Sequence, residues 1–252
     1  MLTKKKIAIA SIETIVRQLI SIGSLILMAR ILSAEDYGDI APLYIVISIA
    51  TGIIDFGIGS AIVRYKNIGL AGESTAFWIN LTISMIIILI LSISAEMISL
   101  YFKNENLKTY LYIVSLSIFI ASLGAIQQNI LLRDQKFELI LIINIISILI
   151  GTLIAVIMAY IGYGSLSLVL QILITNVSLT VLVWVTSDWR PLFTFDKLVF
   201  RRLIEFGFFL TLSGIINAIY KNIGSSLILK TVALNRLDIF IMLKRYNSTS
   251  PI

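Results

Sequence analysis

The chain has 252 residues, of which 58% are hydrophobic and 13% are charged, and its formal net charge is +6. Soluble domains carry about a quarter charged residues, so this composition leaves too little polar surface for a water-soluble globule. The chain contains no cysteine and no histidine, which excludes disulfides, a Ser-His-Asp triad and Cys/His zinc sites. We therefore expect no catalytic centre, no metal and no cofactor.

Seven long apolar runs fill the sequence, and short polar breaks separate them. The runs are Ile7 to Leu32, Ala41 to Val63, Thr75 to Leu100, Tyr110 to Leu132, Leu139 to Ile161, Leu166 to Val185 and Leu203 to Leu229. Each run reaches the roughly 20 residues that a helix needs to cross a hydrocarbon core of about 30 Å. The runs are continuously apolar, whereas the ~10-residue strands of membrane β-barrels alternate apolar with polar residues. The sequence therefore predicts an all-α polytopic membrane protein.

The connections between the runs predict how the chain divides. Short connections place consecutive helices as antiparallel neighbours, so residues 1–185 are expected to form a six-helix transmembrane bundle. A longer polar stretch, 186–202, contains Pro191 and is predicted to be a cytoplasmic linker. It leads to a seventh transmembrane helix at 203–230, and residues 231–252 form a C-terminal tail.

The basic residues predict the orientation in the membrane. With the N-terminus in the cytoplasm, the inner side holds eleven basic residues: Lys4, Lys5, Lys6, Arg64, Lys66, Arg133, Lys136, Arg190, Lys197, Arg201 and Arg202. The outer side holds Arg30, Lys103 and Lys108, and its first loop also holds Glu35, Asp36 and Asp39. Because cytoplasmic loops are enriched in Lys and Arg, a cytoplasmic N-terminus is favoured. The basic residues lie in loops and form no stripe with exposed aromatics, so we expect no nucleic-acid partner.

Charged residues inside the apolar runs are the first candidates for a functional site. Glu13 and Arg17 stand at positions i and i+4, the spacing at which a carboxylate and a guanidinium pair on one helix face. One interpretation is an interfacial pair that orients the first helix, and the other is a face that lines a wet cavity. Asp55 lies nine residues before Arg64, which places it ~13 Å deep, too far for a short carboxylate to reach the surface. A pathway or proton-linked role is favoured for Asp55, with a structural hydrogen bond as the alternative.

Lys221 is the other charged candidate, because it lies in the middle of the seventh run without a carboxylate within one helical turn. A charge at this position implies a cavity, an anionic ligand or a partner on another helix. Asn222 stands beside it on the same predicted polar face. Further amides lie within the runs and are expected to bond to neighbouring helices: Gln127, Gln128, Asn129, Asn144, Gln171, Asn176 and Asn217. Small residues spaced as Ser48/Gly52 and Gly57/Ala61 indicate close helix packing around Asp55.

Five short motifs occur in order along the chain. They are Ala29 to Gly38 (ARILSAEDYG), Asp55 to Arg64 (DFGIGSAIVR), Leu132 to Phe137 (LRDQKF), Gly162 to Val169 (GYGSLSLV) with Gln171, and Trp189-Arg190-Pro191 leading to Glu205-Phe206-Gly207. Together they resemble bacterial polysaccharide exporters of the oligosaccharide flippase type, within the multidrug/oligosaccharidyl-lipid/polysaccharide superfamily. The resemblance covers residues 1 to about 230.

The resemblance implies a function in the bacterial plasma membrane. Proteins of this family carry undecaprenyl-diphosphate-linked oligosaccharide units to the outer leaflet for polysaccharide assembly. The implied partners are the lipid-linked oligosaccharide, membrane lipids and polysaccharide-assembly proteins. A diphosphate cannot cross hydrocarbon unaided, so we expect Arg17 and Lys221 to contact it and Asp55 to carry a proton during alternating access. No family motif assigns these roles residue by residue.

The chain departs from the family pattern in its length. Family members have two six-helix lobes, so this sequence is expected to provide the N-terminal lobe and one further helix, and residues 231–252 lose the pattern. We expect a truncated product, inactive alone, or one half of a split transporter that needs a second lobe. Two other functions stay open. A multidrug antiporter of the same superfamily would need an aromatic-rich cavity, and a non-catalytic structural membrane subunit would need no transport site.

Overall fold

The computed structural model describes residues 4–55, 58–64, 68–207 and 216. All regular secondary structure in these residues is helical: α1 (Lys4–Ile31), α2 (Ala34–Asp55), α3 (Ile58–Arg64), α4 (Gly69–Phe102), α5 (Asn106–Arg133), α6 (Phe137–Ile161) and α7 (Ser165–Thr186). Residues 197–207 are also helical. Five helices, α1, α4, α5, α6 and α7, are long and apolar enough to cross a membrane. The prediction of an all-α polytopic membrane protein is confirmed.

The second predicted helix has different bounds in the structure. The expected run Ala41 to Val63 is divided between α2, which ends at Asp55, and the short α3, which begins at Ile58. Helix α2 also begins earlier, at Ala34, so the acidic residues that we assigned to an outer loop lie in its first turns. Their position is explained by a capping box, a pattern that the hydropathy of the run does not reveal.

The capping box consists of Ser33 and Asp36. The Asp36 backbone N–H donates to Ser33 Oγ at 3.2 Å, and the Ser33 backbone N–H donates to Asp36 Oδ2 at 2.9 Å. Desolvation acts to raise the pKa of Asp36. The Ser33 hydroxyl, which donates to Asp36 Oδ2 at 2.8 Å, and the Ser33 backbone N–H hold that pKa below its ordinary value. Two of the unpaired N–H groups at the start of α2 are thereby satisfied.

Replacing Ser33 by Ala should lower the unfolding free energy by about 1 kcal/mol, because the hydroxyl that accepts from the Asp36 backbone N–H and donates to Asp36 Oδ2 is lost. Since the pKa of Asp36 is lowered in the fold, its contribution should be present above the unfolded pKa of about 3.9 and be lost as the pH falls through the lower folded value. Unfolding of the detergent-solubilised protein measured between neutral and acidic pH checks both points. Ser33→Thr keeps the hydroxyl and should retain the stability; an equal loss in Ser33→Thr and Ser33→Ala would contradict the cap.

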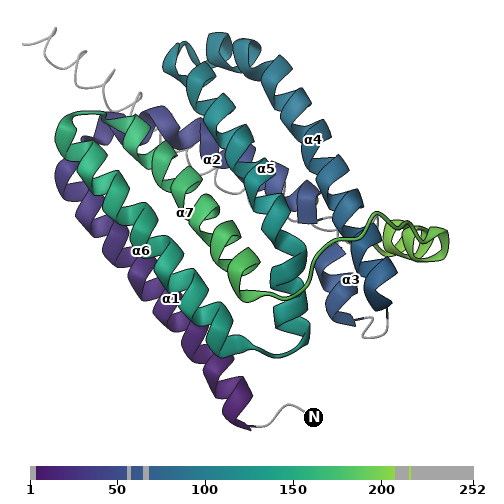
Figure 1. The fold of residues 1–252 in the computed structure, drawn as a ribbon. Coiled ribbons are helices and arrows are strands. Elements are labelled where there is room, and N and C mark those ends of the chain that lie inside the picture. The colour runs from purple at the N-terminus through teal and green to yellow at the C-terminus, as the bar shows by residue number, and fades with distance from the viewer. Residues whose placement is uncertain (1–3, 56–57, 65–67, 208–215, 217–252) are drawn as a thin grey trace, which may run out of the picture. The chain divides into compact units, whose positions relative to one another are not determined.

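Spatial order in the bundle differs from chain order (Figure 1). Helix α1 packs along α6, α6 lies beside α7, α7 beside α5, and α5 beside α4, while α2 contacts α4, α5 and α7. The expectation of consecutive neighbours is correct for the pairs α4/α5 and α6/α7. It is wrong for α1, whose packing partner is α6 and not α2. Polar side chains along α6 and α7 explain why α1 packs against α6.

Polar side chains join α1, α6 and α7 in the interior. Gln171 Nε2 donates to Ser24 Oγ at 2.7 Å and to Thr152 Oγ1 at 3.1 Å, and Thr152 Oγ1 donates to Ser24 Oγ at 3.0 Å. Hydrocarbon offers these groups no partner, so they are satisfied when the helices meet. The small residue Gly151 lets α6 approach α7 closely, because a Cβ added there would lie 3.0 Å from the Gln171 carbonyl oxygen.

The start of α4 carries a buried ion pair. Helix α4 begins at Gly69, ahead of the predicted start at Thr75, so Glu73 lies within its first turns. Arg133 Nη1 donates to Glu73 Oε1 at 2.5 Å, and the two side chains are 15% and 8% exposed. The sequence predicts Arg133 as a loop charge and gives no signal for Glu73. In the structure the pair ties the start of α4 to the end of α5.

The segment after α7 is bound to α4. Trp78 Nε1 donates to the Leu192 carbonyl oxygen at 2.9 Å, the Leu192 backbone N–H donates to Ser74 Oγ at 3.0 Å, and the Trp78 and Phe193 rings stack. Residues 1–211 form one compact unit, and a second unit comprises 212–252. Most of the seventh predicted helix lies outside the described residues, so the division of the chain at residues 185, 202 and 230 stays a prediction.

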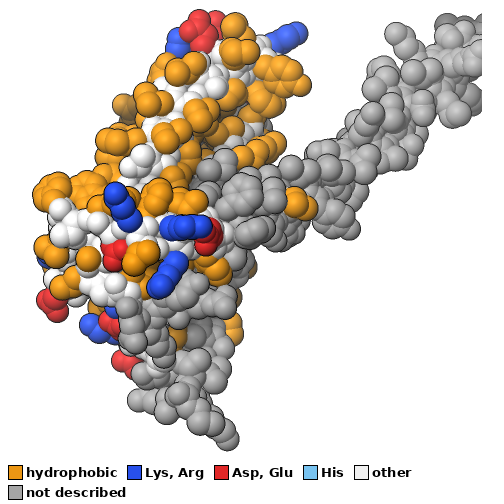
Figure 2. Space-filling model, turned by 90° about the vertical axis from the view of Figure 1, so that its right-hand side faces the viewer, with side chains coloured by type: hydrophobic (Ala, Val, Ile, Leu, Met, Phe, Trp, Pro, Cys, Tyr) orange, Lys and Arg blue, Asp and Glu red, His pale blue; other side chains and the backbone are white. Residues whose placement is uncertain are grey.

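The exposed surface of the bundle is apolar, as contact with lipid requires. Figure 2 shows hydrophobic side chains along the visible face, with charged side chains gathered towards its two ends. Helix α4 contributes large exposed residues to the surface, among them Met85, Ile86, Leu89, Ile90, Ile93 and Met97. An apolar band between charged ends is the pattern of a membrane-spanning surface.

Candidate functional site

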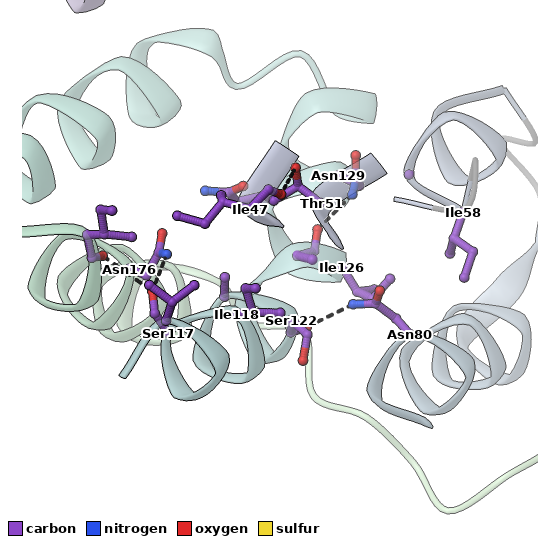
Figure 3. A pocket seen from close by; sticks show the side chains of 16 residues that line it. Ile47, Thr51, Ile58, Asn80, Ser117, Ile118, Ser122, Ile126, Asn129 and Asn176 are labelled. Atoms are coloured by element: carbon purple, nitrogen blue, oxygen red, sulfur yellow. Dashed lines mark hydrogen bonds between the residues drawn. The ribbon is translucent and has the colours of Figure 1, made fainter. Parts of the chain in front are cut away.

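A cavity of about 370 Å³ lies inside the bundle, where residues of α2, α3, α4, α5 and α7 meet (Figure 3). Its walls combine apolar side chains with uncharged polar ones. The polar residues of the lining are Thr51, Asn80, Ser117, Ser122, Gln128, Asn129 and Asn176. A polar cavity among membrane-spanning helices is the first place to look for a transport or binding site.

Hydrogen bonds hold the polar side chains of the lining in place. Asn80 Nδ2 donates to the Ser122 carbonyl oxygen at 3.0 Å, which joins α4 to α5. Asn176 Nδ2 donates to Ser117 Oγ at 2.8 Å, which joins α7 to α5, and Figure 3 shows both contacts. The Gln128 side chain is half-buried and has no hydrogen-bond partner among the described residues. Gln128 therefore offers an unused amide donor and acceptor to the cavity.

The α3 helix lies close to the lining at Gly59. A Cβ added to Gly59 would lie 2.7 Å from Asn129 Oδ1 and 2.8 Å from Asn129 Nδ2. The Asn129 amide, which donates to the Ala125 carbonyl oxygen of its own helix at 2.8 Å, occupies that space. The glycine-rich stretch that the sequence marked as a packing signal thus brings the α3 backbone against a polar side chain of α5.

The described lining favours binding of a neutral polar ligand. Amides and hydroxyls supply donors and acceptors, and none of the described lining residues carries a charge. The described residues also contain no cluster of acidic side chains able to hold a metal ion. The geometry fits a hydroxyl-bearing group better than an isolated diphosphate, which would need cations.

The predicted site residues are not brought together within the described part of the chain. Arg17 is exposed on α1 and lies outside the cavity lining. Glu13 lies in α1 and Asp55 is the last residue of α2, but their side chains lie outside the described residues. Lys221 and Asn222 also lie outside the described residues.

Amide residues inside the apolar runs predicted the cavity lining better than the charged residues did. Several amides inside the apolar runs were expected to bond across helices, and Gln171 and Asn176 do so. Asn129 bonds within its own helix instead, and Gln128 faces the cavity. Sequence reasoning missed Asn80, which is buried in α4. A lone amide within a long apolar run could have identified it by the same argument.

Comparison with known proteins gives a consistent result. The model of a family described as "Polysaccharide biosynthesis protein" matches residues 27–249. The chain is 28% identical to the succinoglycan biosynthesis transport protein ExoT of Rhizobium meliloti (strain 1021), over 77% of this chain and 39% of that protein. It is 24% identical to the teichuronic acid biosynthesis protein TuaB of Bacillus subtilis (strain 168), over 75% of this chain and 39% of that protein.

A third relative extends the coverage of this chain. The lipopolysaccharide biosynthesis protein WzxC of Escherichia coli (strain K12) is 22% identical over 86% of this chain and 44% of that protein. The chain therefore spans less than half the length of these three relatives. No solved structure matches the chain.

Proposed function

Because this chain belongs to the polysaccharide biosynthesis protein family, we propose that it takes part in moving lipid-linked oligosaccharide units across the bacterial plasma membrane. In this role the chain binds and translocates, and catalyses no bond-breaking step. Its relatives bear names of polysaccharide biosynthesis and transport proteins. The resemblance to polysaccharide exporters stated from the motifs is confirmed at the level of the family.

The observation that carries the proposal is the cavity lined by uncharged polar side chains among the membrane-spanning helices. Polar side chains are costly inside a membrane, and those that line a cavity offer their remaining donors and acceptors to a polar ligand or to water. Sugar hydroxyls are matched by such groups. A multidrug antiporter would need an aromatic-rich cavity. The described lining of this cavity has no aromatic residue, and the neighbouring cavity has two, Tyr37 and Tyr44. The cavity therefore favours the oligosaccharide over an apolar cation.

The charged candidates keep their proposed roles in the pathway. Arg17 and Lys221 would contact the diphosphate, with Glu13 and Asn222 lining the path. Asp55 would carry a proton, and its backbone stands in sequence between Thr51 and Ile58, which both line the cavity. A second lobe and polysaccharide-assembly proteins are the proposed protein partners, and the surrounding lipid holds the isoprenoid chain.

The proposal is tested by transport in liposomes. Purified protein is reconstituted together with a second-lobe chain taken from a full-length relative, because transport is not expected of this chain alone. A fluorescent isoprenoid-diphosphate oligosaccharide is included, and its transfer between leaflets is followed by chemical quenching. Transfer above the level of empty liposomes is expected, and Asn80→Leu should reduce it. Transport of a cationic dye without transfer of the lipid-linked sugar would favour the antiporter. A third outcome would favour the structural subunit: neither substrate is transferred, and the other polysaccharide-assembly proteins need this chain in order to assemble.

With the second lobe supplied, replacing Asp55 by Asn should impair transport driven by an imposed proton gradient more than it impairs membrane insertion. The amide keeps the shape of the carboxylate but does not titrate, so a proton-carrying step is lost while packing is preserved. Gradient-driven uptake compared with the amount of inserted protein gives the measurement. Equal losses of insertion and transport would support the packing interpretation of Asp55.

A cytoplasmic N-terminus is also proposed from the basic residues. Reporter fusions after Leu70 and Gln135 should report the cytoplasm, and fusions after Asp36 and Asn104 should report the outside. A reversed pattern would overturn this orientation.

A further inference from the structure

A second cavity, of about 340 Å³, is lined by residues of α1, α2, α6 and α7. We call the cavity of Figure 3 the first chamber and this cavity the second chamber. Met28, near the end of α1, and Leu168, near the start of α7, line the second chamber. Asn129, in the last turns of α5, lines the first. The chambers thus extend towards opposite ends of the helices.

The two chambers share a wall. Ile172 and Asn176 of α7 line both of them. Asn176 Nδ2 donates to Ser117 Oγ at 2.8 Å, and Ser117 belongs to the lining of the first chamber. The Asn176–Ser117 hydrogen bond therefore lies at the boundary between the chambers, and breaking one hydrogen bond between neutral groups costs little compared with moving a helix.

The lining chemistry is the same on both sides of this boundary. The second chamber presents hydroxyls and an amide, from Tyr37, Tyr44, Thr175 and Gln171, and none of its described lining residues is charged. The Tyr37 hydroxyl is buried and has no hydrogen-bond partner in the described part of the chain. The Tyr37 hydroxyl in the second chamber and the Gln128 amide in the first are therefore hydrogen-bonding groups available to a ligand.

We propose that the two chambers are halves of one water-accessible binding site for an uncharged, hydroxyl-bearing sugar segment, partitioned by the Asn176–Ser117 hydrogen bond. The inference rests on the proposed function. It adds that this chain binds the sugar segment of the lipid-linked oligosaccharide. Hydroxyls and amides match the rim of a sugar ring, and the apolar walls match its C–H faces. The diphosphate is bound elsewhere, because the described lining of neither chamber offers it a cation.

The absence of cysteine from the sequence makes the proposal directly testable. Single cysteines are introduced at Ala125 in the first chamber and Thr175 in the second, both half-buried lining positions. Two methanethiosulfonate reagents are compared in membranes: a neutral glucosylethyl reagent and an anionic sulfonatoethyl reagent. Each forms a mixed disulfide with the thiolate and releases methanesulfinate. Rates are divided by those measured with a free thiol.

Two control positions define the extremes of reactivity. A cysteine at Ile93, which is 78% exposed on α4 and lines neither chamber, should face lipid and stay unreactive. A cysteine at Glu105, exposed between α4 and α5, should react with both reagents. At Ala125 and Thr175 the glucosylethyl reagent should react faster than the sulfonatoethyl reagent by at least about tenfold, whereas at Glu105 the two rates should be similar.

A variant that lacks the Asn176–Ser117 hydrogen bond tests whether this bond separates the two chambers. With reagent added from the side of the membrane that exposes Glu105, Asn176→Ala should raise the rate at the Ala125 cysteine by at least about tenfold. The matched control is Asn144→Ala, which removes an amide of α6 outside both linings and should leave that rate unchanged.

The outcomes separate this proposal from the proposed function. Chamber cysteines as unreactive as the Ile93 cysteine, or equally reactive with both reagents, would overturn the neutral sugar site even if the protein transports lipid-linked sugar. An unchanged rate at Ala125 in Asn176→Ala would overturn the partition. Selective labelling in a protein that transports no lipid-linked sugar even with the second lobe supplied would uphold the site and contradict the proposed function.

Discussion

Replacing Glu73 by Gln should lower the unfolding free energy by about 3 kcal/mol, because it leaves the Arg133 guanidinium without its buried carboxylate. Both partners are largely removed from solvent, at 15% and 8% exposure, so solvent screening reduces the effect little. The remaining partner, Asp134, is 42% exposed and bonds Arg133 Nε at 3.2 Å. Reversible unfolding in mixed detergent micelles, monitored by circular dichroism, gives the measurement.

A surface ion pair supplies the matched control. Lys108 Nζ lies 3.2 Å from Glu96 Oε2, with exposures of 43% and 70%. Glu96→Gln should therefore change stability by less than about 1 kcal/mol. The double variant Glu73→Gln/Arg133→Met should recover part of the loss, since no charge is then left buried. Equal effects of Glu73→Gln and Glu96→Gln would show that the buried pair does not anchor α4 to α5.

Replacing Gly151 by Leu should separate α6 from α7. The overpacked interface should lower the unfolding free energy by about 3 kcal/mol. A Cβ at this position would lie 2.0 Å from Thr175 Oγ1 and 3.0 Å from the Gln171 carbonyl oxygen. The hydroxyl can rotate away, but the carbonyl belongs to the α7 backbone and moves only with the helix. The yield of folded protein and its unfolding midpoint give the measurement.

Gly23 provides the control for this second variant. A Cβ added to Gly23 of α1 would meet nothing within 4 Å, so Gly23→Ala should be neutral or stabilise by up to about 1 kcal/mol through helix propensity. Gly151→Ala/Thr175→Ala should be less harmful than Gly151→Ala alone, because one of the two close contacts is removed. If Gly151→Leu were tolerated as well as Gly23→Ala, the close approach of α6 and α7 would be wrong.

The apolar runs predicted most of the fold because lipid imposes a simple rule. A helix that satisfies its own backbone in hydrocarbon needs a long apolar sequence. Helices α5 to α7 follow that rule with ends near the predicted ones, whereas α4 begins earlier, at Gly69. The rule says nothing about which helix packs on which. Helix α1 pairs with α6 through Ser24 and Thr152, far apart in sequence, and a single sequence contains no signal for that contact.

The candidate site was predicted less well, for a physical reason. Charged residues were the first site candidates because burying a charge in a membrane is costly. The described cavity is instead lined by amides and hydroxyls, which occur throughout the helices. Whether Asn80 faces a cavity, lipid or another helix depends on helix rotation, which hydropathy does not determine. Glu73 was missed because a loop was expected where α4 begins.

The pairing of α1 with α6 has a consequence for biogenesis. Residues 32–136 separate the two helices in the chain, and ribosomes add about 5–20 residues per second. Nascent α1 must therefore wait in the bilayer, on the order of 5 to 20 seconds at that rate, before α6 is made. During this interval Ser24 has neither Gln171 nor Thr152 as a hydrogen-bond partner. Helix α1 is thus expected to stay in contact with the insertion machinery until α6 and α7 have been made.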